Sequence, residues 1–112
     1  MNFDFSDDQK ELREQAQRFL RDRCTPKAVR NILEGGDTYD RTLWKGVVEM
    51  GWTATVIPEE FGGLGLGYLE LCVIAEELGR VVAPIPFASS VYLATEAILL
   101  AGSAEQKAKY LP

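Results

Sequence analysis

The sequence predicts an all-α protein, an orthogonal helical bundle of about six helices. Two observations support this fold class: apolar residues recur every three or four positions along most of the chain, and helix-capping residues stand directly before those stretches. A third observation is that only residues 53–57 have the β-branched composition of a strand, and one such segment cannot form a sheet. We interpret that segment as an extended connector and residues 1–112 as one helical domain.

The first helix is expected to begin after Ser6. Ser6 and Gln9 have the spacing of a capping box, in which each side chain binds a backbone N–H group of the other residue. The apolar residues that follow at helical spacing predict one buried face. That face comprises Leu12, Ala16, Phe19 and Leu20.

Two further helices are expected before the middle of the chain. Thr25 followed by Pro26 is a typical helix start, and the short helix that follows, with little to bury, should end at Gly35. The third helix should start near Asp40 and stop at Gly51. We expect its inward residues to be Leu43, Trp44, Val47 and Val48, joined by Trp52 as a second tryptophan in the core.

Residues 57–67 form a loop that turns the chain between two apolar segments. Pro58 cannot donate a backbone hydrogen bond, and four glycines within six residues permit positive φ and close backbone approach. A glycine-rich turn before a helix can also bind phosphate. However, Tyr68 stands where the dinucleotide fingerprint needs its third glycine, and no G-K-[ST] follows. We therefore interpret the loop as one required by tight packing.

The helix that follows this loop is expected over residues 68–78. It is apolar almost all round, which predicts a central and buried element. Glu76 and Glu77 are expected at its exposed end. A crossing loop with two prolines should follow over residues 79–86, and a last short helix should open at the second capping box, which starts at Ser103.

A helix expected over residues 87–101 has one face of mostly small residues. Such a face either lets two helices approach closely or lines a cavity, and from the residues alone we prefer close packing. The residues that share this side at helical spacing are Pro86, Ser89, Ser90, Leu93 and Ala97.

The charge balance argues against two classes of partner. The chain has 12 basic and 17 acidic side chains, a net charge of −5, so no patch is expected to neutralise the phosphates of a nucleic acid or of an anionic membrane surface. No stretch reaches the roughly 18 to 20 consecutive apolar residues of a membrane span. We expect a soluble protein that binds no nucleic acid.

Histidine is absent, and no metal site is predicted. Cys24 and Cys72 are too far apart for a C-x-x-C motif, and each lies in an apolar helical pattern. We interpret both as small buried hydrophobic residues in a reducing compartment. The chain opens without a secretory or organellar leader, which favours a cytoplasmic location.

Three segments carry a resemblance to a known family. They are IPEEFGGLG at residues 57–65, EELG at 76–79 and AGSAEQKAKYLP at 101–112. In this order and spacing they resemble the N-terminal domain of the acyl-CoA dehydrogenases, over nearly the whole chain. The resemblance implies an FAD flavoprotein, usually a homo- or hetero-tetramer, that removes an α-proton from an acyl-CoA thioester with a glutamate and passes the β-hydride to the flavin.

The resemblance also places much of that machinery in other parts of such enzymes. It implies that the flavin-binding β-domain, the C-terminal helical domain and the catalytic glutamate all lie beyond Pro112. No catalytic residue is therefore assigned in this chain, and FAD is not expected to bind it alone. Glu59 and Glu60 match the loop motif and not the catalytic base.

For this chain the resemblance implies a helical domain that packs against the flavin domain and forms part of the acyl-binding pocket. The resemblance therefore favours a cavity, and not close packing of two helices, on the small-residue face. The expected pocket wall comprises Pro86, Phe87, Ser89, Ser90, Leu93 and Ala97.

The proline-rich segment 80–87 departs from the common pattern and resembles the steroid-degrading branch of the family. There, two different subunits assemble, and one can lack a complete site. Straight-chain acyl-CoA therefore cannot be assumed as the substrate. The alternative reading is a structural or non-catalytic partner subunit that contributes to the assembly of a heteromeric dehydrogenase.

Overall fold

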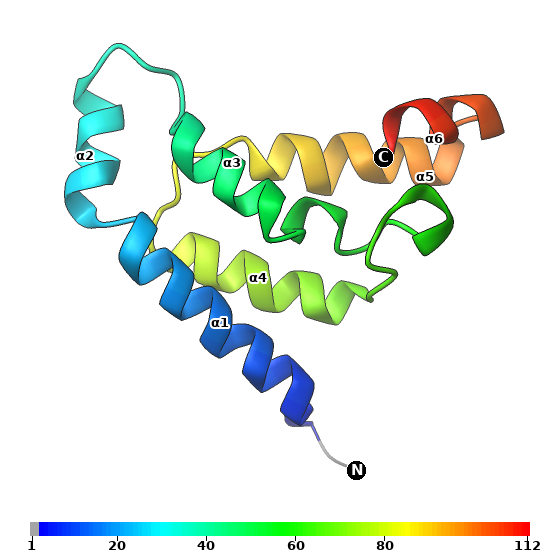
Figure 1. Cartoon of the computed structure of the whole chain (residues 1–112), viewed down its shortest axis with the longest axis horizontal. Coiled ribbons are helices and arrows are strands. Elements are labelled where there is room, and N and C mark those ends of the chain that lie inside the picture. The colour runs from blue at the N-terminus through cyan, green and yellow to red at the C-terminus, as the bar shows by residue number, and fades with distance from the viewer. Residues whose placement is uncertain (1–2) are drawn as a thin grey trace.

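A computed structural model describes residues 3–112, and in that range the chain is all-helical, with six α-helices and no strand (Figure 1). The predicted all-α fold class is confirmed. The α-helices are α1 (Asp7–Arg23), α2 (Pro26–Glu34), α3 (Arg41–Glu49), α4 (Tyr68–Arg80), α5 (Glu96–Ala101) and α6 (Ala104–Tyr110). Two 3₁₀ turns, η1 (Trp52–Ala54) and η2 (Glu59–Phe61), and one π-helix, η3 (Ala88–Thr95), complete the order.

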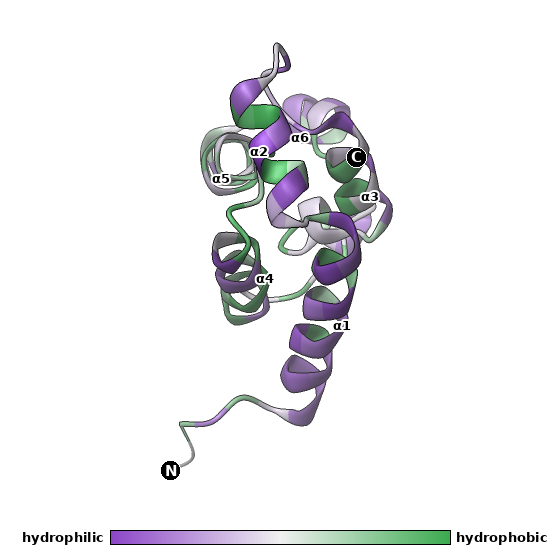
Figure 2. Cartoon of the chain, turned by 90° about the vertical axis from the view of Figure 1, so that its left-hand side faces the viewer, coloured by the Kyte–Doolittle hydropathy of each residue, from purple (hydrophilic) through white to green (hydrophobic). Residues whose placement is uncertain are grey.

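The helices form a flat assembly. α1 packs along α4, while η3 and α5 run as one rod beside α4 in the opposite direction (Figure 1). The principal extents are 42 × 41 × 19 Å, so the thin dimension holds about two helices at roughly 10 Å each. In the side view, the loop that leads from α4 to η3 is largely green, that is apolar, whereas α1 is mostly purple (Figure 2).

The core lies where α1, α3 and α4 meet. The predicted inner face of α1 is confirmed, because Ala16 and Leu20 are fully buried and Phe19 packs edge-to-face on Trp52 with ring centroids 5.3 Å apart. Trp44 is only partly buried against this core. The buried cluster comprises Ala16, Leu20, Cys24, Leu43, Val47, Trp52, Leu71, Ile74, Leu78, Phe87 and Val91.

Three apolar residues that were predicted to be buried are exposed. Val48 is 46% exposed because it is turned by about 100° from the buried Val47, and α3 meets the core on one side only. Cys72 is exposed, unlike Cys24, and Leu69 on the same helix is 51% exposed. An apolar surface all round α4 therefore does not mean burial all round within this chain.

The predicted caps are confirmed. Both capping boxes form, at Ser6 with Gln9 and at Ser103 with Gln106. Asp40 caps α3 by accepting a hydrogen bond from the backbone N–H of Leu43. α2 buries none of its residues fully, as expected for a helix with little to bury.

Residues 53–57 are not extended. The segment starts in the 3₁₀ turn η1, because the Thr55 hydroxyl donates to the carbonyl of Trp52 at 2.6 Å and the Thr55 backbone N–H donates to the same carbonyl. This side-chain bond favours a tight turn over an extended strand. The turn lets Trp52 enter the core while the chain reverses toward the glycine loop.

The glycine loop is closed by its own backbone, as the packing interpretation predicted. A Cβ atom added at Gly63 would lie 1.9 Å from the carbonyl oxygen of Ile57, which only glycine avoids. The backbone N–H groups of Leu64, Gly65 and Leu66 donate to carbonyl groups of residues 54–57 at 2.8–2.9 Å. These contacts fix the direction in which α4 begins.

In the described range no helix is long and apolar enough to cross a membrane.

Candidate functional site

An apolar groove separates α4 from η3. Its volume is about 320 Å³, and small residues at its rims, Ala75 and Gly79 on α4 and Ala88 on η3, keep it open. Leu78 and Phe87, both buried, form its floor. The full lining is Ala75, Leu78, Gly79, Val82, Ala83, Ile85, Phe87, Ala88 and Tyr92.

The η3 wall of this groove is π-helical, which the sequence reading did not foresee. The Thr95 hydroxyl donates to the carbonyl of Ser90, five residues earlier, at 2.7 Å. π-helical turns are rare and occur frequently at functional sites. The wider turn changes which residues share a face, so a periodicity of 3.6 residues does not describe residues 88–95.

The six residues predicted to form a pocket wall fall into two groups. Phe87 lines the groove and packs edge-to-face on Tyr92 with centroids 5.5 Å apart. The other five do not line it. Pro86 and Ser90 are half-buried, whereas Ser89, Leu93 and Ala97 are exposed and recur every four residues along η3 and α5.

Two η3 residues of the groove, Ala88 and Tyr92, were missed by the sequence reading. With 3.6 residues per turn, Tyr92 falls outside the face of small residues. The spacing of Ala88 and Tyr92, four residues apart beside a proline-rich segment, was the available signal. Burial raises the pKa of the Tyr92 phenol above its ordinary value.

A hydrogen-bonded pair joins the same two helical rods further along. The Tyr68 hydroxyl, at the start of α4, lies 2.9 and 3.0 Å from the two carboxylate oxygens of Glu96, the first residue of α5. The carboxylate raises the pKa of Tyr68, since it accepts the phenolic proton in a hydrogen bond. Tyr68 therefore acts as a donor in this pair.

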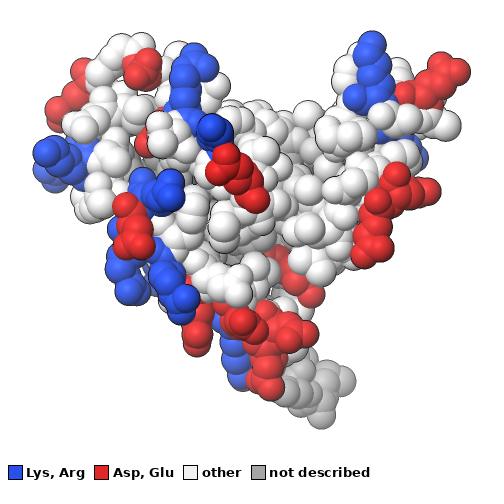
Figure 3. Space-filling view, in the orientation of Figure 1, with Lys and Arg blue, Asp and Glu red and all other residues white. Residues whose placement is uncertain are grey.

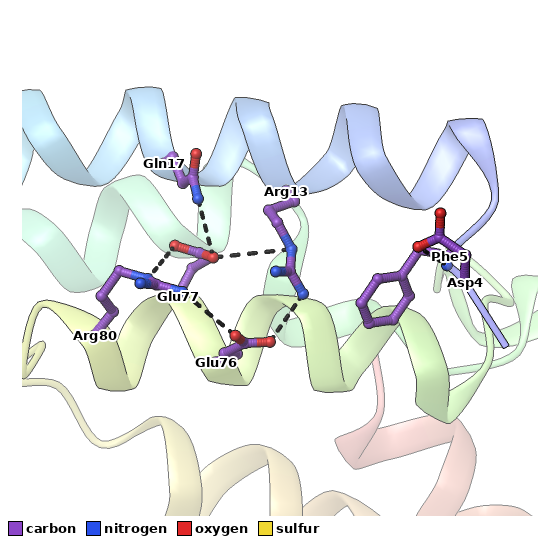
Figure 4. A network of polar contacts seen from close by, with 7 residues as sticks. All are labelled: Asp4, Phe5, Arg13, Gln17, Glu76, Glu77 and Arg80. Carbon is purple, nitrogen blue, oxygen red and sulfur yellow. Dashed lines mark hydrogen bonds and ion pairs between the residues drawn. The ribbon is translucent and has the colours of Figure 1, made fainter.

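A polar network between α1 and α4 occupies the opposite side of α4 (Figure 4). Glu77, predicted to be exposed, is buried at 1% exposure because α1 covers it. Gln17 donates to one of its oxygens at 3.2 Å, and Arg80 Nε lies 3.3 Å from the other. Arg13 binds the neighbouring Glu76 at 2.8 Å and stacks over the Phe5 ring at 4.8 Å.

Neither the glycine loop nor the start of α4 fits a pyrophosphate group. The loop amides already donate to carbonyl groups within the turn. At the start of α4, the N–H of Gly67 donates to the Glu70 carboxylate at 3.1 Å, which places a negative charge where a phosphate would bind. Among residues 3–112, no three acidic or cysteine side chains are grouped to hold a metal ion.

These features define a helical domain with an apolar groove and no pyrophosphate cradle at its glycine loop. The sequence pattern of the family described as "Acyl-CoA dehydrogenase, N-terminal domain" matches residues 6–112. The chain therefore belongs to the acyl-CoA dehydrogenase family.

Two curated relatives illustrate the similarity. Isovaleryl-CoA dehydrogenase, mitochondrial, of Arabidopsis thaliana is 34% identical over 110 residues, which cover 96% of this chain and 27% of the relative. Acyl-CoA dehydrogenase IpdE2 of Mycolicibacterium smegmatis is 38% identical over 101 residues, or 89% of this chain and 32% of the relative. The chain thus spans about a quarter to a third of the lengths of these relatives.

Solved structures agree with the fold. The chain matches a structure of the ChsE4-ChsE5 complex from Mycobacterium tuberculosis with a TM-score of 0.87 and 29% identity, over 99% of this chain and 30% of that one. It matches butyryl-CoA dehydrogenase from Megasphaera elsdenii with a TM-score of 0.81 and 25% identity, again over 99% and 30%.

Proposed function

We propose that this chain is the helical domain of an FAD-dependent acyl-CoA dehydrogenase, and that it provides one wall of the pocket for the acyl group. The observation that carries the proposal is the open apolar groove between α4 and η3 in a member of this family. Small rim residues leave room for an alkyl chain, and the buried floor removes that chain from water. The role of this domain is to bind and orient the acyl group.

We assign the cofactor and the chemical step to other parts of the intact protein. The described residues offer no cradle for the FAD pyrophosphate at the glycine loop. The flat shape and the exposed apolar residues of α4 and α5 are consistent with packing against a flavin domain.

The predicted wall remains part of this proposal. Phe87 already lines the groove, and the exposed strip of Ser89, Leu93 and Ala97 would complete the pocket where another domain packs on η3 and α5. Ser90 is half-buried beside this strip. Side-chain volume at these positions would then set the size of the accepted acyl group.

The substitution Ser90→Phe tests this wall in the intact enzyme. A phenyl ring should shorten the longest accepted acyl group, because each displaced methylene is worth about 1 to 3 kcal/mol of transition-state binding in an apolar pocket. We expect kcat/KM for long acyl-CoA substrates to fall at least tenfold, while short substrates are spared. The measurement is kcat/KM across a series of acyl-CoA lengths, with the melting temperature recorded for each variant.

A purely structural role for Ser90 gives a different result. In that case the phenyl ring overpacks the π-helical turn and lowers the free energy of unfolding by roughly 1 to 3 kcal/mol. All substrates would then lose activity equally, together with a lower melting temperature. That outcome would refute the pocket assignment.

A second candidate function is a partner subunit in a heteromeric dehydrogenase. The observation that favours it is the similarity to the two-component ChsE4-ChsE5 structure, together with the proline-rich segment 80–87. Flavin absorbance and activity of the purified intact protein would distinguish the two roles. Activity that appears only after a second, different subunit is added would support the partner role.

A further inference from the structure

Another apolar groove lies between α2 and the end of α4. Its volume is about 470 Å³, within the range of about 300 to 1,000 Å³ that is usual for small-molecule pockets. One face of α2 forms a wall of this groove, because its lining residues recur at helical spacing. The lining comprises Pro26, Val29, Arg30 and Leu33 from α2, Arg80, Val81 and Val82 from the end of α4, and Cys24 from the junction of α1 and α2.

The inner part of this groove is packed, and its outer part is open. Cys24 is buried, and its sulfur lies 3.8 Å from the carbonyl oxygen of Val81, which joins the start of α2 to the end of α4. Val29 packs partly against the core. Leu33, one turn further along α2, is 76% exposed. The groove therefore has a fixed base and an apolar rim that nothing in the described chain covers.

Val82, on the α4 side of the groove, has a backbone conformation that valine rarely adopts. Its φ is 53°, the one positive φ at a non-glycine position among residues 3–112. Such a φ is strained for a β-branched side chain, and glycine is the usual residue where a helix ends in this way. The Val82 side chain is nevertheless 69% exposed, so packing within the described chain does not offset the strain. Strained positions of this kind cluster at ligand sites.

Two arginines give the groove a positive rim. Arg80 is held in place by two carboxylates, with its Nε 3.3 Å from the buried Glu77 and a terminal nitrogen 3.3 Å from Glu76. Arg30 has no ion pair or hydrogen bond to any of the residues that the structure describes. An arginine without a counter-charge therefore stands beside exposed apolar side chains, in a chain whose net charge is −5.

We propose that this groove binds an amphipathic carboxylic acid, with its carboxylate on Arg30 and its hydrocarbon part between α2 and Val82. Arginine can bind a carboxylate through two parallel N–H···O bonds. The hydrocarbon would cover Leu33 and Val82 and so remove their apolar surface from water. A neutral hydrocarbon would leave Arg30 unpaired, and a small anion would leave the apolar rim exposed.

This site is distinct from the groove between α4 and η3. Val82 forms a ridge that lines both grooves, but Arg30 and Leu33 line the new one alone. The inference does not depend on the proposed function, because it concerns the binding of a free acid and requires no turnover.

Calorimetric titration of the intact protein tests the site, with decanoate and the neutral decanamide as probes. We expect decanoate to bind about tenfold more tightly, because a hydrogen bond between two charged groups is roughly twice as strong as a neutral one. Arg30→Gln should remove this difference and leave the affinity for decanamide unchanged. Lys27→Gln is the matched control, since it removes a positive charge from the same helix at an exposed residue outside the groove.

Val82→Gly separates binding from folding. Glycine adopts a positive φ without strain, so the melting temperature should not fall, while both probes should bind several-fold more weakly because an apolar wall is lost. Ala88→Phe obstructs the groove between α4 and η3 and should leave the affinity for decanoate unchanged. Loss of decanoate binding in Ala88→Phe would place the acid in that other groove and overturn the inference.

A parallel titration with cyclohexanebutyrate distinguishes a ring-bearing acid from a straight-chain one as the source of the carboxylate. Tighter binding of either acid supports the inference when Arg30→Gln removes it. Equal affinities for decanoate and decanamide, or equal losses in Arg30→Gln and Lys27→Gln, would overturn it. So would the absence of saturable binding, which is the result expected if another part of the intact protein or a partner protein covers the groove.

Discussion

Glu77 is buried although its neighbour in sequence, Glu76, is not. Its carboxylate is buried under α1, while Glu76, one residue earlier, is half exposed. Gln17 and Arg80 satisfy the Glu77 oxygens, and Arg13 Nε approaches at 3.9 Å without a hydrogen bond. The buried charge therefore depends on partners from both α1 and α4.

Removal of the Glu77 carboxylate should weaken the packing of α1 on α4. Glu77→Ala is expected to lower the free energy of unfolding by about 3 kcal/mol, because it removes the carboxylate to which Gln17 donates and opens space under α1. Glu76→Ala is the matched control and should cost less than about 1 kcal/mol, as for an exposed ion pair. Urea denaturation followed by circular dichroism measures both. Similar losses in the two variants would contradict the importance of burial.

At the scale of elements, two backbone features fix parts of the helices on either side of the groove. The π-helical turn of η3 widens the rod that carries Phe87 and Tyr92, and the closed glycine loop fixes the start of α4. The backbone conformation of η3 therefore shapes one wall of the candidate site.

A substitution at Gly63 tests whether the glycine loop is required by tight packing. Gly63→Ala would force a Cβ atom against the Ile57 carbonyl, so the backbone must shift, and we expect a loss of about 3 kcal/mol in the free energy of unfolding. Gly36→Ala is the control, because no atom lies within 4 Å of the added methyl and φ there is not positive. A melting temperature for Gly63→Ala equal to that of the control would refute the packing role of the loop.

The elements that sequence predicted well are those set by local interactions. The Ser6 and Ser103 capping boxes and the α1 face need only neighbours within one or two turns, so spacing reveals them. The spacing of the apolar residues did not reveal the π-helix, because we interpreted it with the α-helical period of 3.6 residues. Glu77 was misplaced because nothing in two adjacent glutamates shows which one a distant helix will cover.

The candidate site was predicted in part for the same reason. Phe87, which was predicted to form part of a pocket wall, lines the groove because it directly follows the proline segment that turns the chain into η3. Tyr92 and Ala88 depend on the wider π turn, and the α4 side of the groove depends on tertiary packing. Neither is encoded in the spacing of one segment.

At the scale of the whole molecule, the chain is flat and rich in exposed apolar side chains. Its accessible surface is 7453 Å², against about 6,200 Å² for a compact monomer of this size. Charged side chains are dense along α1 and α2 and sparser over the rest of the face in Figure 3. Exposed apolar residues outside those two helices include Leu64, Leu66, Leu69, Leu93, Leu100 and Tyr110.

This surface predicts that the isolated chain self-associates. Apolar area left uncovered in solution favours contacts between copies, so we expect dimers or larger species and binding of a hydrophobic dye at micromolar concentration. Sedimentation velocity and dye fluorescence check both expectations. The purified chain should also show no flavin absorbance. A monodisperse monomer that binds no dye would contradict the prediction.

The 19 Å thickness has a further consequence for motion. In a slab about two helices thick, no backbone amide lies more than one helix from solvent. Deuterium exchange in the isolated chain should then report how readily each helix opens rather than how deep it lies. The slowest amides are expected where α1 and α4 cover each other, and the fastest in α2, which buries no residue fully. Within a larger assembly, the difference in exchange rate between these helices should disappear, because other parts would cover each face of the slab.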